Sequence, residues 1–254
     1  MTEQNIQAPK KFKILLIGDD CIDTYYFGNV NRISPEAPVP VFEGKYVITK
    51  DGMAGNVKNN LEKLGCTVKY LHGDTSRKER LIDERSKQHI IRIDNDKQSV
   101  PILVDRDMTK NYDAIVVSDY NKGTVTYELV KQLRLDFSGP IFVDTKKPDL
   151  AQFEGCFVKI NKTENNKATS VPSSQWLIVT HGHLGAVWDG RAFSGEIVGD
   201  VTDVTGAGDT FIAALVYKYL ESKKVTDAIK FANKAAALTV QHVGVYAPRL
   251  EEIG

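Results

Sequence analysis

The sequence has few cysteines and none of the spacings that bind metals. Its three cysteines, Cys21, Cys66 and Cys156, are widely separated and form no Cys-x-x-Cys pair, so neither a zinc site nor a disulfide framework is indicated. His181 and His183 alternate along a predicted strand and would point to opposite faces, and no third ligand lies nearby in sequence. We therefore expect no zinc, and reduced, mostly buried thiols of the kind found in the cytoplasm.

The sequence also lacks an excess of charge of either sign and any long apolar run. Lys and Arg together number 33, as do Asp and Glu, which gives a formal net charge of +0. Such a balance does not favour binding to nucleic acid or to an anionic membrane. No apolar stretch approaches bilayer-spanning length, and residues 1–11 lack the apolar core of a signal peptide. We expect a cytoplasmic protein with neither nucleic acid nor membrane as a partner.

The remaining composition is sufficient for one domain with a large core. Of the 254 residues, 42% are hydrophobic, and we treat residues 1–254 as a single domain. Apolar runs of strand length alternate with segments of helical spacing, which predicts an α/β fold with a mostly parallel sheet and helices on both faces. The predicted strands are residues 12–17, 67–71, 113–117, 140–143, 157–160 and 176–179, and the predicted helices are residues 52–64, 127–135, 208–221 and 226–240.

Polar residues follow several of the predicted strands. Asp119, Asp144 and Asn161 each come within two residues of the end of an apolar run. Because the carboxyl ends of parallel strands meet at one edge of a sheet, where ligands bind in α/β proteins, these residues predict a ligand-binding rim. Asp23 lies just beyond the first strand, which we expect to end at Gly18; it either binds a polar substrate or caps a turn.

Two further regions predict a small accessory sheet. Prolines exclude a helix in residues 37–42 and favour an edge strand or an extended loop there. Residues 79–85 and 88–94 have the pattern of two arms of a hairpin. Five basic residues in or beside this hairpin either hold a phosphate-bearing substrate or face solvent. They are Arg77, Lys78, Arg80, Arg85 and Arg92.

The stretch from Asp203 to Phe211 (Asp-Val-Thr-Gly-Ala-Gly-Asp-Thr-Phe) joins a turn of small residues to an apolar helix. Such a turn directs backbone N–H groups at an anion, and the positive end of the helix dipole adds to the attraction. The stretch lacks the Gly-Lys-Ser/Thr of a Walker A loop, and Phe211 stands where a dinucleotide fingerprint needs its third glycine. Two interpretations remain: a hole for a phosphoryl group with Asp209 at its mouth, or a glycine-rich cap on a buried helix.

The position of Asp209 bears on how it would act. A carboxylate at a helix N-terminus is favoured in its charged form, so we expect Asp209 to be a weak base. Phosphoryl transfer tolerates a weak base, because its transition state is loose and demands little proton abstraction until late. We therefore expect the position of Asp209 to matter more than its basicity.

Two polar residues of the predicted helices have open interpretations. Asn56 lies in the first turn of the helix predicted at residues 52–64, and it is either a helix cap or an amide that donates to a substrate hydroxyl. Asn233, in the middle of the helix predicted at residues 226–240, is either a ligand contact or a polar-face residue.

Residues 203–211 match the second signature of the ribokinase-like, PfkB-type carbohydrate kinases. Residues 52–56 (Gly-Met-Ala-Gly-Asn) are similar to the first signature of that family, with Met53 in place of a usual glycine. The resemblance covers essentially the whole chain. It implies a three-layer αβα fold with a mostly parallel central sheet and a small β-sheet lid at residues 23–49 and 77–96. Within the family, several segments most resemble the heptose 7-phosphate kinases of ADP-heptose biosynthesis: Gly18 and Asp19 with Asp23, residues 31–41, residues 118–120 with 122–123, and Asp144.

The resemblance also implies a role for each matching residue. Asp209 would be the base, and Gly206, Ala207 and Gly208 would form the anion hole. Asp23, Gly52 and Asn56 would bind the sugar. Asn161 and Glu164 would lie near the ATP phosphates and hold a magnesium ion through water, and the nucleotide pocket would be formed by Thr180, Gly182, Gly185 and Asn233.

By the same resemblance the ligands would be ATP, Mg²⁺, a sugar or sugar phosphate and, in some members, a monovalent cation. The lid often mediates dimerisation in this family, so a homodimer through the lid is expected. Two alternatives stay open: a kinase for another sugar or a nucleoside, and a catalytically weak sugar- or nucleotide-binding dimer.

The sequence departs from the family pattern in two places. After Gly73 and Asp74 the chain passes almost directly to Arg77, where relatives carry an additional helix and strand, and this shortening predicts an altered pocket or an open sheet edge. The turn of residues 182–185, Gly-His-Leu-Gly, lacks the lysine of a Gly-Glu-Lys-Gly-like turn. No nucleotidyltransferase half follows Gly254, so we expect any such second activity on another chain.

Overall fold

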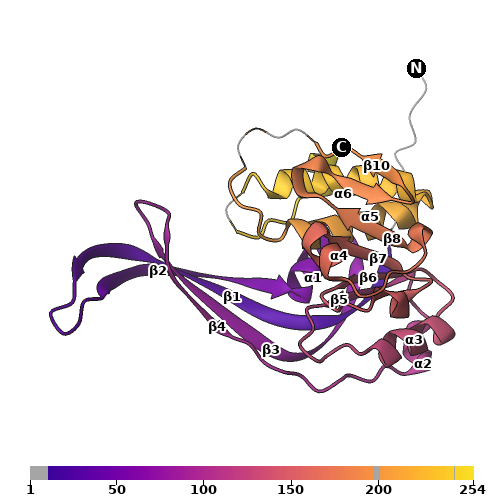
Figure 1. The fold of residues 1–254 in the computed structure, drawn as a ribbon, viewed down its shortest axis with the longest axis horizontal. Coiled ribbons are helices and arrows are strands. Elements are labelled where there is room, and N and C mark those ends of the chain that lie inside the picture. Colours follow the sequence, from indigo (N-terminus) through magenta and orange to yellow (C-terminus); the bar gives the residue numbers. More distant parts are fainter. Residues whose placement is uncertain (1–10, 197–198, 200, 243) are drawn as a thin grey trace.

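The protein has a ten-stranded mixed sheet with helices packed on both of its faces (Figure 1). The structure is a computed structural model that describes residues 11–196, 199, 201–242 and 244–254; of the polar N-terminal segment, all but Lys11 lies outside this range. The strands are β1 (Lys13–Ile33), β2 (Pro40–Met53), β3 (Thr67–Asp83), β4 (His89–Asn95), β5 (Ala114–Asp119), β6 (Ile141–Thr145), β7 (Phe157–Asn161), β8 (Leu177–Thr180), β9 (Ala186–Trp188) and β10 (Arg191–Phe193). The α-helices are α1 (Ala54–Lys63), α2 (Arg106–Thr109), α3 (Tyr127–Asp136), α4 (Lys162–Lys167), α5 (Ala207–Ser222), α6 (Val225–Thr239) and α7 (Leu250–Ile253).

The centre of the sheet is parallel, as predicted. The strand order is β10-β9-β8-β7-β6-β5-β1-β3-β4, with β2 paired to β1. Neighbours from β8 through to β3 run parallel, whereas β9, β10, β2 and β4 pair antiparallel. The carboxyl ends of β5, β6 and β7 therefore lie at one edge, where the polar residues after these strands meet.

Alternation along the buried strands divides the core into two apolar layers. Ile14 and Leu16 of β1 pack in the layer that contains α1, α5, α6 and α7. Leu15 and Ile17 of the same strand pack in the layer with α3. Helices on both faces of a mostly parallel sheet make a three-layer αβα architecture, so the predicted fold class is confirmed.

Two strands are much longer than predicted, because both continue from the core into the lid region. β1 does not end at Gly18 but runs 21 residues to Ile33, and the predicted strand at residues 67–71 joins the predicted hairpin arm at 79–85 as the single strand β3. The prediction of separate short strands was wrong here. From Asp20 onward the strand is held by pairing on both sides, with β2 and with β3.

The outer parts of β1 to β4 form a four-stranded extension that projects from the core (Figure 1). We call residues 23–50 and 77–95 the lid sheet. Register places Lys50, Asp23 and Lys78 opposite one another, and next to them Tyr25 and Arg80. Paired residues share a face of a sheet, so these side chains lie on one face, and Val47, Tyr26, Leu81 and Ile91 lie on the other.

The shortened segment forms an irregularity in β3 and leaves part of the sheet edge open. Pairing with β1 jumps from Gly18 opposite His72 to Asp20 opposite Thr75. β4 pairs with β3 only from Arg77 onward. Within the described residues, no strand pairs with the outer edge of residues 67–72, which agrees with the open edge predicted from the missing helix and strand.

Among the helices of the described ranges, none is long and apolar enough to cross a bilayer.

Candidate active site

Helix α5 begins at the glycine-rich turn and carries Asp209 in its first turn. Gly206 caps the helix with φ 81° and ψ −5°, a left-handed conformation that glycine adopts without strain. A Cβ at this position would lie 2.8 Å from the Asn56 side-chain nitrogen, so the turn also packs tightly against α1. Helix starts of this kind attract anions through backbone N–H groups and the helix dipole.

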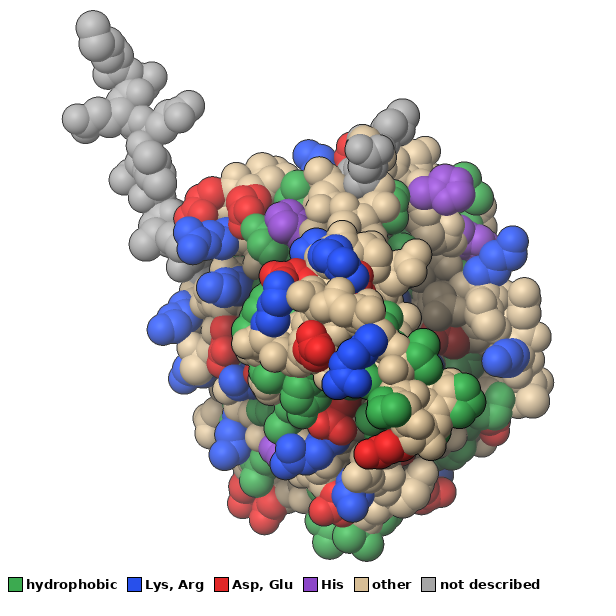
Figure 2. All heavy atoms as spheres, turned by 90° about the vertical axis from the view of Figure 1, so that its left-hand side faces the viewer, with side chains coloured by type: hydrophobic (Ala, Val, Ile, Leu, Met, Phe, Trp, Pro, Cys, Tyr) green, Lys and Arg blue, Asp and Glu red, His purple; other side chains and the backbone are tan. Residues whose placement is uncertain are grey.

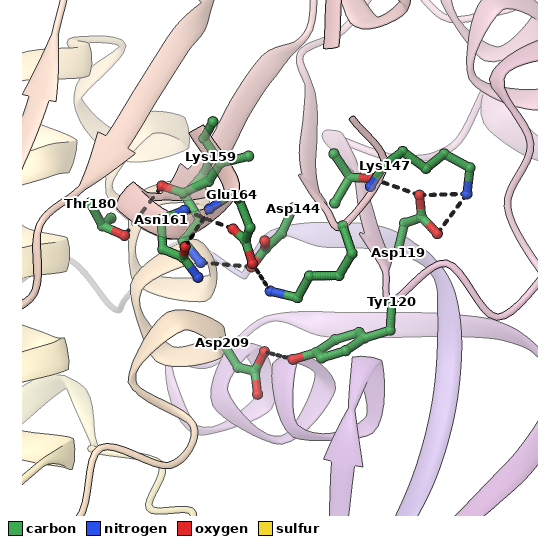
Figure 3. Close-up of polar contacts among 12 residues, drawn as sticks. Asp119, Tyr120, Asp144, Lys147, Lys159, Asn161, Glu164, Thr180 and Asp209 are labelled. Carbon is green, nitrogen blue, oxygen red and sulfur yellow. Dashed lines mark hydrogen bonds and ion pairs between the residues drawn. The ribbon is translucent and has the colours of Figure 1, made fainter. Parts of the chain in front are cut away.

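The Asp209 carboxylate is buried and held by a hydrogen bond on each oxygen. Asn56 Nδ2 donates to Oδ2 over 2.8 Å, and the Tyr120 hydroxyl donates to Oδ1 over 2.9 Å. The structure thus brings together Asn56, predicted for the sugar site, and Asp209, predicted as the base. It adds Tyr120, whose hydrogen bond to Asp209 is drawn in Figure 3. Asn56 acts through its side-chain amide and makes no helix-cap hydrogen bond.

Burial raises the pKa of Asp209 to about 6. The hydrogen bonds from Asn56 and Tyr120 and the charge of Lys159 lower this pKa, while Asp144 raises it. The expectation of a weak base was therefore wrong. The position at a helix N-terminus favours the charged form, but removal of the carboxylate from water outweighs it.

Tyr120 is held in place by Asp19, a buried residue of β1. The Asp19 carboxylate accepts hydrogen bonds from the backbone N–H groups of Tyr120, Lys122 and Thr124, over 2.7, 3.0 and 3.3 Å. Tyr120 is a proton donor at neutral pH, because burial raises its pKa well above the ordinary value. The loop after β5 therefore presents a fixed hydroxyl to Asp209.

Asp144 and Lys159 form a buried ion pair next to the helix start. They are opposite one another on β6 and β7, and Lys159 Nζ lies 2.7 Å from Asp144 Oδ2. A Cβ on Gly208 would lie 2.9 Å from Lys159 Nζ, so the ammonium group faces the glycine turn. The other oxygen, Asp144 Oδ1, is buried and has no hydrogen-bond partner among the described residues. Such an atom needs a water, an ion or a ligand to complete its hydrogen bonding.

Asn161 and Glu164 form a reciprocal capping box at the start of α4. Asn161 Oδ1 accepts from the Glu164 N–H over 2.9 Å, and Glu164 Oε2 accepts from the Asn161 N–H over 2.7 Å. Lys146 forms an ion pair with Glu164 and lies over the Tyr120 ring, 5.3 Å from its centroid. Burial alone would lower the pKa of Lys146, but Asp144 and Glu164 raise it overall. In the view of Figure 3, the side chains of Asp144 and Glu164 lie above that of Asp209.

A cavity of about 330 Å³ lies beside the glycine turn. All four residues predicted for the nucleotide pocket line it, together with Ala207 and Gly208 of the predicted anion hole. Asn233 also has a local role, because its Nδ2 donates to the carbonyl oxygens of Phe193 and Ser194. The lining residues are Thr180, Gly182, His183, Gly185, Gly195, Glu196, Val201, Val204, Ala207, Gly208, Phe211, Asn233, Ala236, Ala237 and Val240.

The predicted sugar residues lie where the lid sheet meets α1. Asp23 is buried and accepts a hydrogen bond from Arg80 NH1 over 2.6 Å, while Arg80 also lies over the Tyr25 ring. A Cβ on Gly52 would lie 2.2 Å from Asp23 Oδ2, so only glycine leaves room for the carboxylate here. Gly52 lies at the end of β2, two residues before α1, whose Asn56 hydrogen-bonds Asp209.

The basic residues of the hairpin do not form one cluster. Arg92 pairs with Asp94, and Arg85 donates to the Val30 carbonyl, both at exposed positions. Arg80 is buried with Asp23, and Lys78 is opposite Asp23 in register. Figure 2, which views the lid end of the molecule, shows basic and acidic side chains interspersed with hydrophobic ones.

Tyr120 and Lys159 have no assigned role in the sequence analysis. Lys159 leaves a signal, since it is a charged residue inside an otherwise apolar strand, Phe157 to Ile160. Tyr120 leaves only its position after a predicted strand, because its partner is 89 residues away. The pattern Asn-x-x-Glu at 161–164 is also that of a capping box at a helix start, which is the arrangement these two residues adopt here.

Residues 142–253 match the model of the pfkB family carbohydrate kinases. Among curated proteins, the chain is 34% identical to the bifunctional protein HldE of Nitratiruptor sp. over 301 aligned positions, covering 96% of this chain and 64% of that protein. It is 32% identical to HldE of Helicobacter pylori strain J99, covering 95% and 65% of the two chains. The chain thus spans about two thirds of the length of these relatives. The 301 aligned positions exceed its 254 residues, so the first alignment contains gaps in this chain.

Solved structures share the fold at low identity. The ribokinase of Thermotoga maritima has a TM-score of 0.70 with 17% identity, covering 95% of this chain and 98% of that one. The ribokinase of Arabidopsis thaliana, solved with ribose and ATP, has the same TM-score and identity and covers 96% and 98%. These likenesses confirm the predicted ribokinase-like fold.

Proposed function

Because this chain belongs to the pfkB family of carbohydrate kinases, and is therefore a phosphotransferase with a hydroxyl group as acceptor, we propose that it phosphorylates a heptose 7-phosphate with ATP. One observation carries the mechanism: the buried Asp209 carboxylate, whose pKa is about 6, lies at the start of α5 beside a cavity lined by Ala207 and Gly208. A carboxylate in that place can accept the proton of a hydroxyl that attacks a phosphoryl group bound at the helix start.

The transfer proceeds in line between two bound substrates. The acceptor oxygen forms a bond to the γ-phosphorus as the bond from that phosphorus to the β–γ bridging oxygen breaks. The bridging oxygen leaves with the electron pair on ADP, and the acceptor proton passes to Asp209. Asn56 and Tyr120 orient the carboxylate through their hydrogen bonds to its two oxygens. Backbone N–H groups from Gly206 to Gly208 stabilise charge on the phosphoryl oxygens.

The cavity beside α5 accommodates the nucleotide. Thr180, Gly182, Gly185 and Asn233 line it, and Gly208 connects it to Asp209. The mostly apolar lining from α6 suits the face of a base, and the α5 start suits its phosphates.

The oxygen ligands near β6 and α4 fit a magnesium ion. Mg²⁺ prefers carboxylate oxygens and retained waters, and Asp144 Oδ1 is buried without a partner among the described residues. Asn161 and Glu164 are bonded to one another, so they would hold the ion through water. When bound, magnesium would neutralise charge on the ATP phosphates. A monovalent cation stays a prediction from the family resemblance.

The face of the lid sheet next to the core supplies the acceptor site. Asp23 would accept hydrogen bonds from sugar hydroxyls, with Gly52 leaving room for it. The same face carries Lys50, Lys78 and Arg80 in register with Asp23 or Tyr25. Its cations outnumber its carboxylates near Asp23, and this supports an acceptor that carries a phosphate.

An activity panel tests the proposal. Purified protein is assayed for ADP release with ATP, Mg²⁺ and a set of heptose 7-phosphates, other sugar phosphates, free sugars and nucleosides. We expect turnover with heptose 7-phosphate and a loss of about a thousandfold in Asp209→Asn, since a positioned base contributes roughly 10² to 10⁴. Turnover with a free sugar or a nucleoside would reassign the acceptor. Binding of sugar and nucleotide with no turnover would favour the binding protein.

The outer face of the lid sheet supports a homodimer. Val47, Tyr26, Leu81 and Ile91 form an apolar row across its four strands, and Val47 and Ile91 are 54% and 50% exposed. An exposed apolar row on a single-layer sheet is typical of an interaction surface. We expect a dimer by light scattering, and a monomer in Val47→Lys at the same concentration. A wild-type monomer throughout the micromolar range would contradict this proposal.

The reaction takes place in the cytoplasm under this proposal, because ATP is available there. The three cysteines are free and buried, as expected for reduced thiols.

A further inference from the structure

Lys159 is a charged residue in the interior of the core. It lies on β7 between Val158 and Ile160, which are both fully buried, and it is itself 3% exposed. Burying an ion pair is expensive, and apolar residues of the same volume would stabilise the fold at least as well. Stability therefore does not account for an ammonium group at this place.

Lys159 Nζ lies next to Asp144 and the glycine turn. Its acceptor among the described residues is Asp144 Oδ2, at 2.7 Å, which uses one of its three protons. On another side it faces Gly208, where a Cβ would lie only 2.9 Å away. Gly208 lines the cavity beside α5. The ammonium group thus lies between Asp144 and the start of α5, the helix that carries Asp209. The second oxygen of Asp144 has no partner in the described part of the chain.

On the basis of the proposed kinase function, we propose that Lys159 is a further catalytic residue, whose ammonium group contacts a non-bridging oxygen of the transferring phosphoryl group. The charge of that group spreads over its three equatorial oxygens during transfer. A fixed cation in a site shielded from water stabilises this charge without reorganisation. Asp144 holds the Lys159 Nζ in place between turnovers.

A second observation agrees with this position. The turn of residues 182–185 has His183 and Leu184 where the family resemblance places a lysine, and Leu184 is 65% exposed. The turn of residues 182–185 thus has no lysine to contact the phosphates. Under this proposal Lys159 of β7 supplies the positive charge instead. The charge of Lys159 also reaches Asp209, whose pKa it lowers.

Nucleotide binding tests the contact without knowledge of the acceptor. The affinities of ADP and of the non-hydrolysable triphosphate AMP-PNP are measured by calorimetry with Mg²⁺ for the wild type and Lys159→Met. We expect the variant to lose about tenfold or more on AMP-PNP and less than about twofold on ADP, because only the triphosphate carries the γ-phosphoryl group. Comparing two ligands on one protein cancels any partial loss of folded material.

Each other outcome has a separate meaning. Equal losses on both nucleotides, or none, would overturn the role of Lys159 while leaving the kinase proposal intact. A wild type that binds neither nucleotide would overturn the kinase proposal and this one with it.

Turnover gives the second readout. We expect kcat to fall by about a hundredfold or more in Lys159→Met, with partial recovery in Lys159→Arg, by analogy with loss of one oxyanion donor. The matched control is Lys147→Met, because Lys147 forms a buried pair with Asp119 at 2.8 Å that faces away from Asp209 (Figure 3). That control is expected to lose stability but keep kcat per folded molecule. An equal kcat in both variants would reduce Lys159 to a structural role.

Discussion

The centre around Asp209 and the lid sheet hold their charges in opposite ways. At the centre, Asp144, Lys159 and Asp209 are nearly inaccessible to solvent and are fixed by contacts of 2.7 to 2.9 Å. In the lid, the pairs of Arg32 with Glu43 and of Arg92 with Asp94 are 3.8 and 2.7 Å long, but their side chains are 42% to 58% exposed. Buried charges interact strongly and tolerate little displacement, whereas exposed pairs are screened and contribute little. The charged side chains around Asp209 are therefore held more rigidly than those of the lid.

The pair of Asp23 and Arg80 is the exception that links the two regions. It belongs to the lid strands, yet its side chains are only 9% and 10% exposed. It lies where the lid sheet meets α1, next to Gly52. The strength of a charge pair is thus expected to depend on how deeply it is buried, and not on whether it belongs to the lid or the core.

Arg80→Met is expected to have the largest effect on stability. It leaves the Asp23 charge buried without a partner, and breaking a buried pair in this way costs about 3 to 5 kcal/mol. Urea unfolding would measure the loss, and the KM for the acceptor is expected to rise as Asp23 loses its orientation. A loss below about 1 kcal/mol would place this pair with the exposed lid pairs.

Asp209→Asn is expected to stabilise the protein as it removes activity. In the folded state the pKa of Asp209 is about 6, against an ordinary value of 3.8. Between pH 3.8 and pH 6 the unfolded chain has released the Asp209 proton, whereas the folded chain still binds it. The free energy of unfolding therefore falls as the pH rises through this range, and the whole loss is present above about pH 6. The amide should gain roughly 3 kcal/mol at pH 8 and nothing below about pH 4. Thermal unfolding at both pH values measures this, and an equal gain at both would contradict the burial argument.

Tyr120→Phe should have a moderate effect on turnover. Losing one hydrogen bond to a charged group costs about 1.5 to 3 kcal/mol, or at least about tenfold in kcat/KM. Wild-type kcat/KM is expected to rise with pH up to about 6, as Asp209 loses its proton, and then level off. Because the Tyr120 hydrogen bond lowers the pKa of Asp209, the variant's rise should move to higher pH. Tyr127→Phe, remote from Asp209, is the control; an unmoved profile in Tyr120→Phe would show that Tyr120 does not act on the base.

Arg32→Ala should have the smallest effect. Its pair with Glu43 is exposed and 3.8 Å long, so the free energy of unfolding, measured by urea titration, should change by less than about 0.5 kcal/mol. A cost near that of Arg80→Met would erase the contrast between lid and core.

The sequence predicted the core better than it predicted the junctions. Apolar runs such as residues 113–117 and 157–160 identified core strands because both faces of those strands are buried. The continuation of β1 beyond Gly18 could not be predicted, because pairing with two partners, rather than apolar character, keeps residues 20–28 in the strand.

The candidate site divides in the same way. Contiguous motifs indicated Asp209, Gly206 and Asn56, and the structure joins these residues. Tyr120 and Lys159 meet Asp209 and Gly208 only through the fold, so no spacing in the sequence encodes their contacts. The raised pKa of Asp209 likewise depends on burial, which a local pattern does not report.

The uninterrupted course of β1 has a mechanical consequence. The strand passes from the core into the lid sheet without a break, and its register with β3 changes between Gly18 and Asp20. This step is the place where the regular pairing of β1 with β3 is interrupted. Asp19 lies at the step and holds the loop of Tyr120, which contacts Asp209. The lid is thus connected to Asp209 by two routes, one through Asp19 and the Tyr120 loop and one through β2 and Asn56 of α1, so a movement of the lid reaches both hydrogen bonds of the carboxylate.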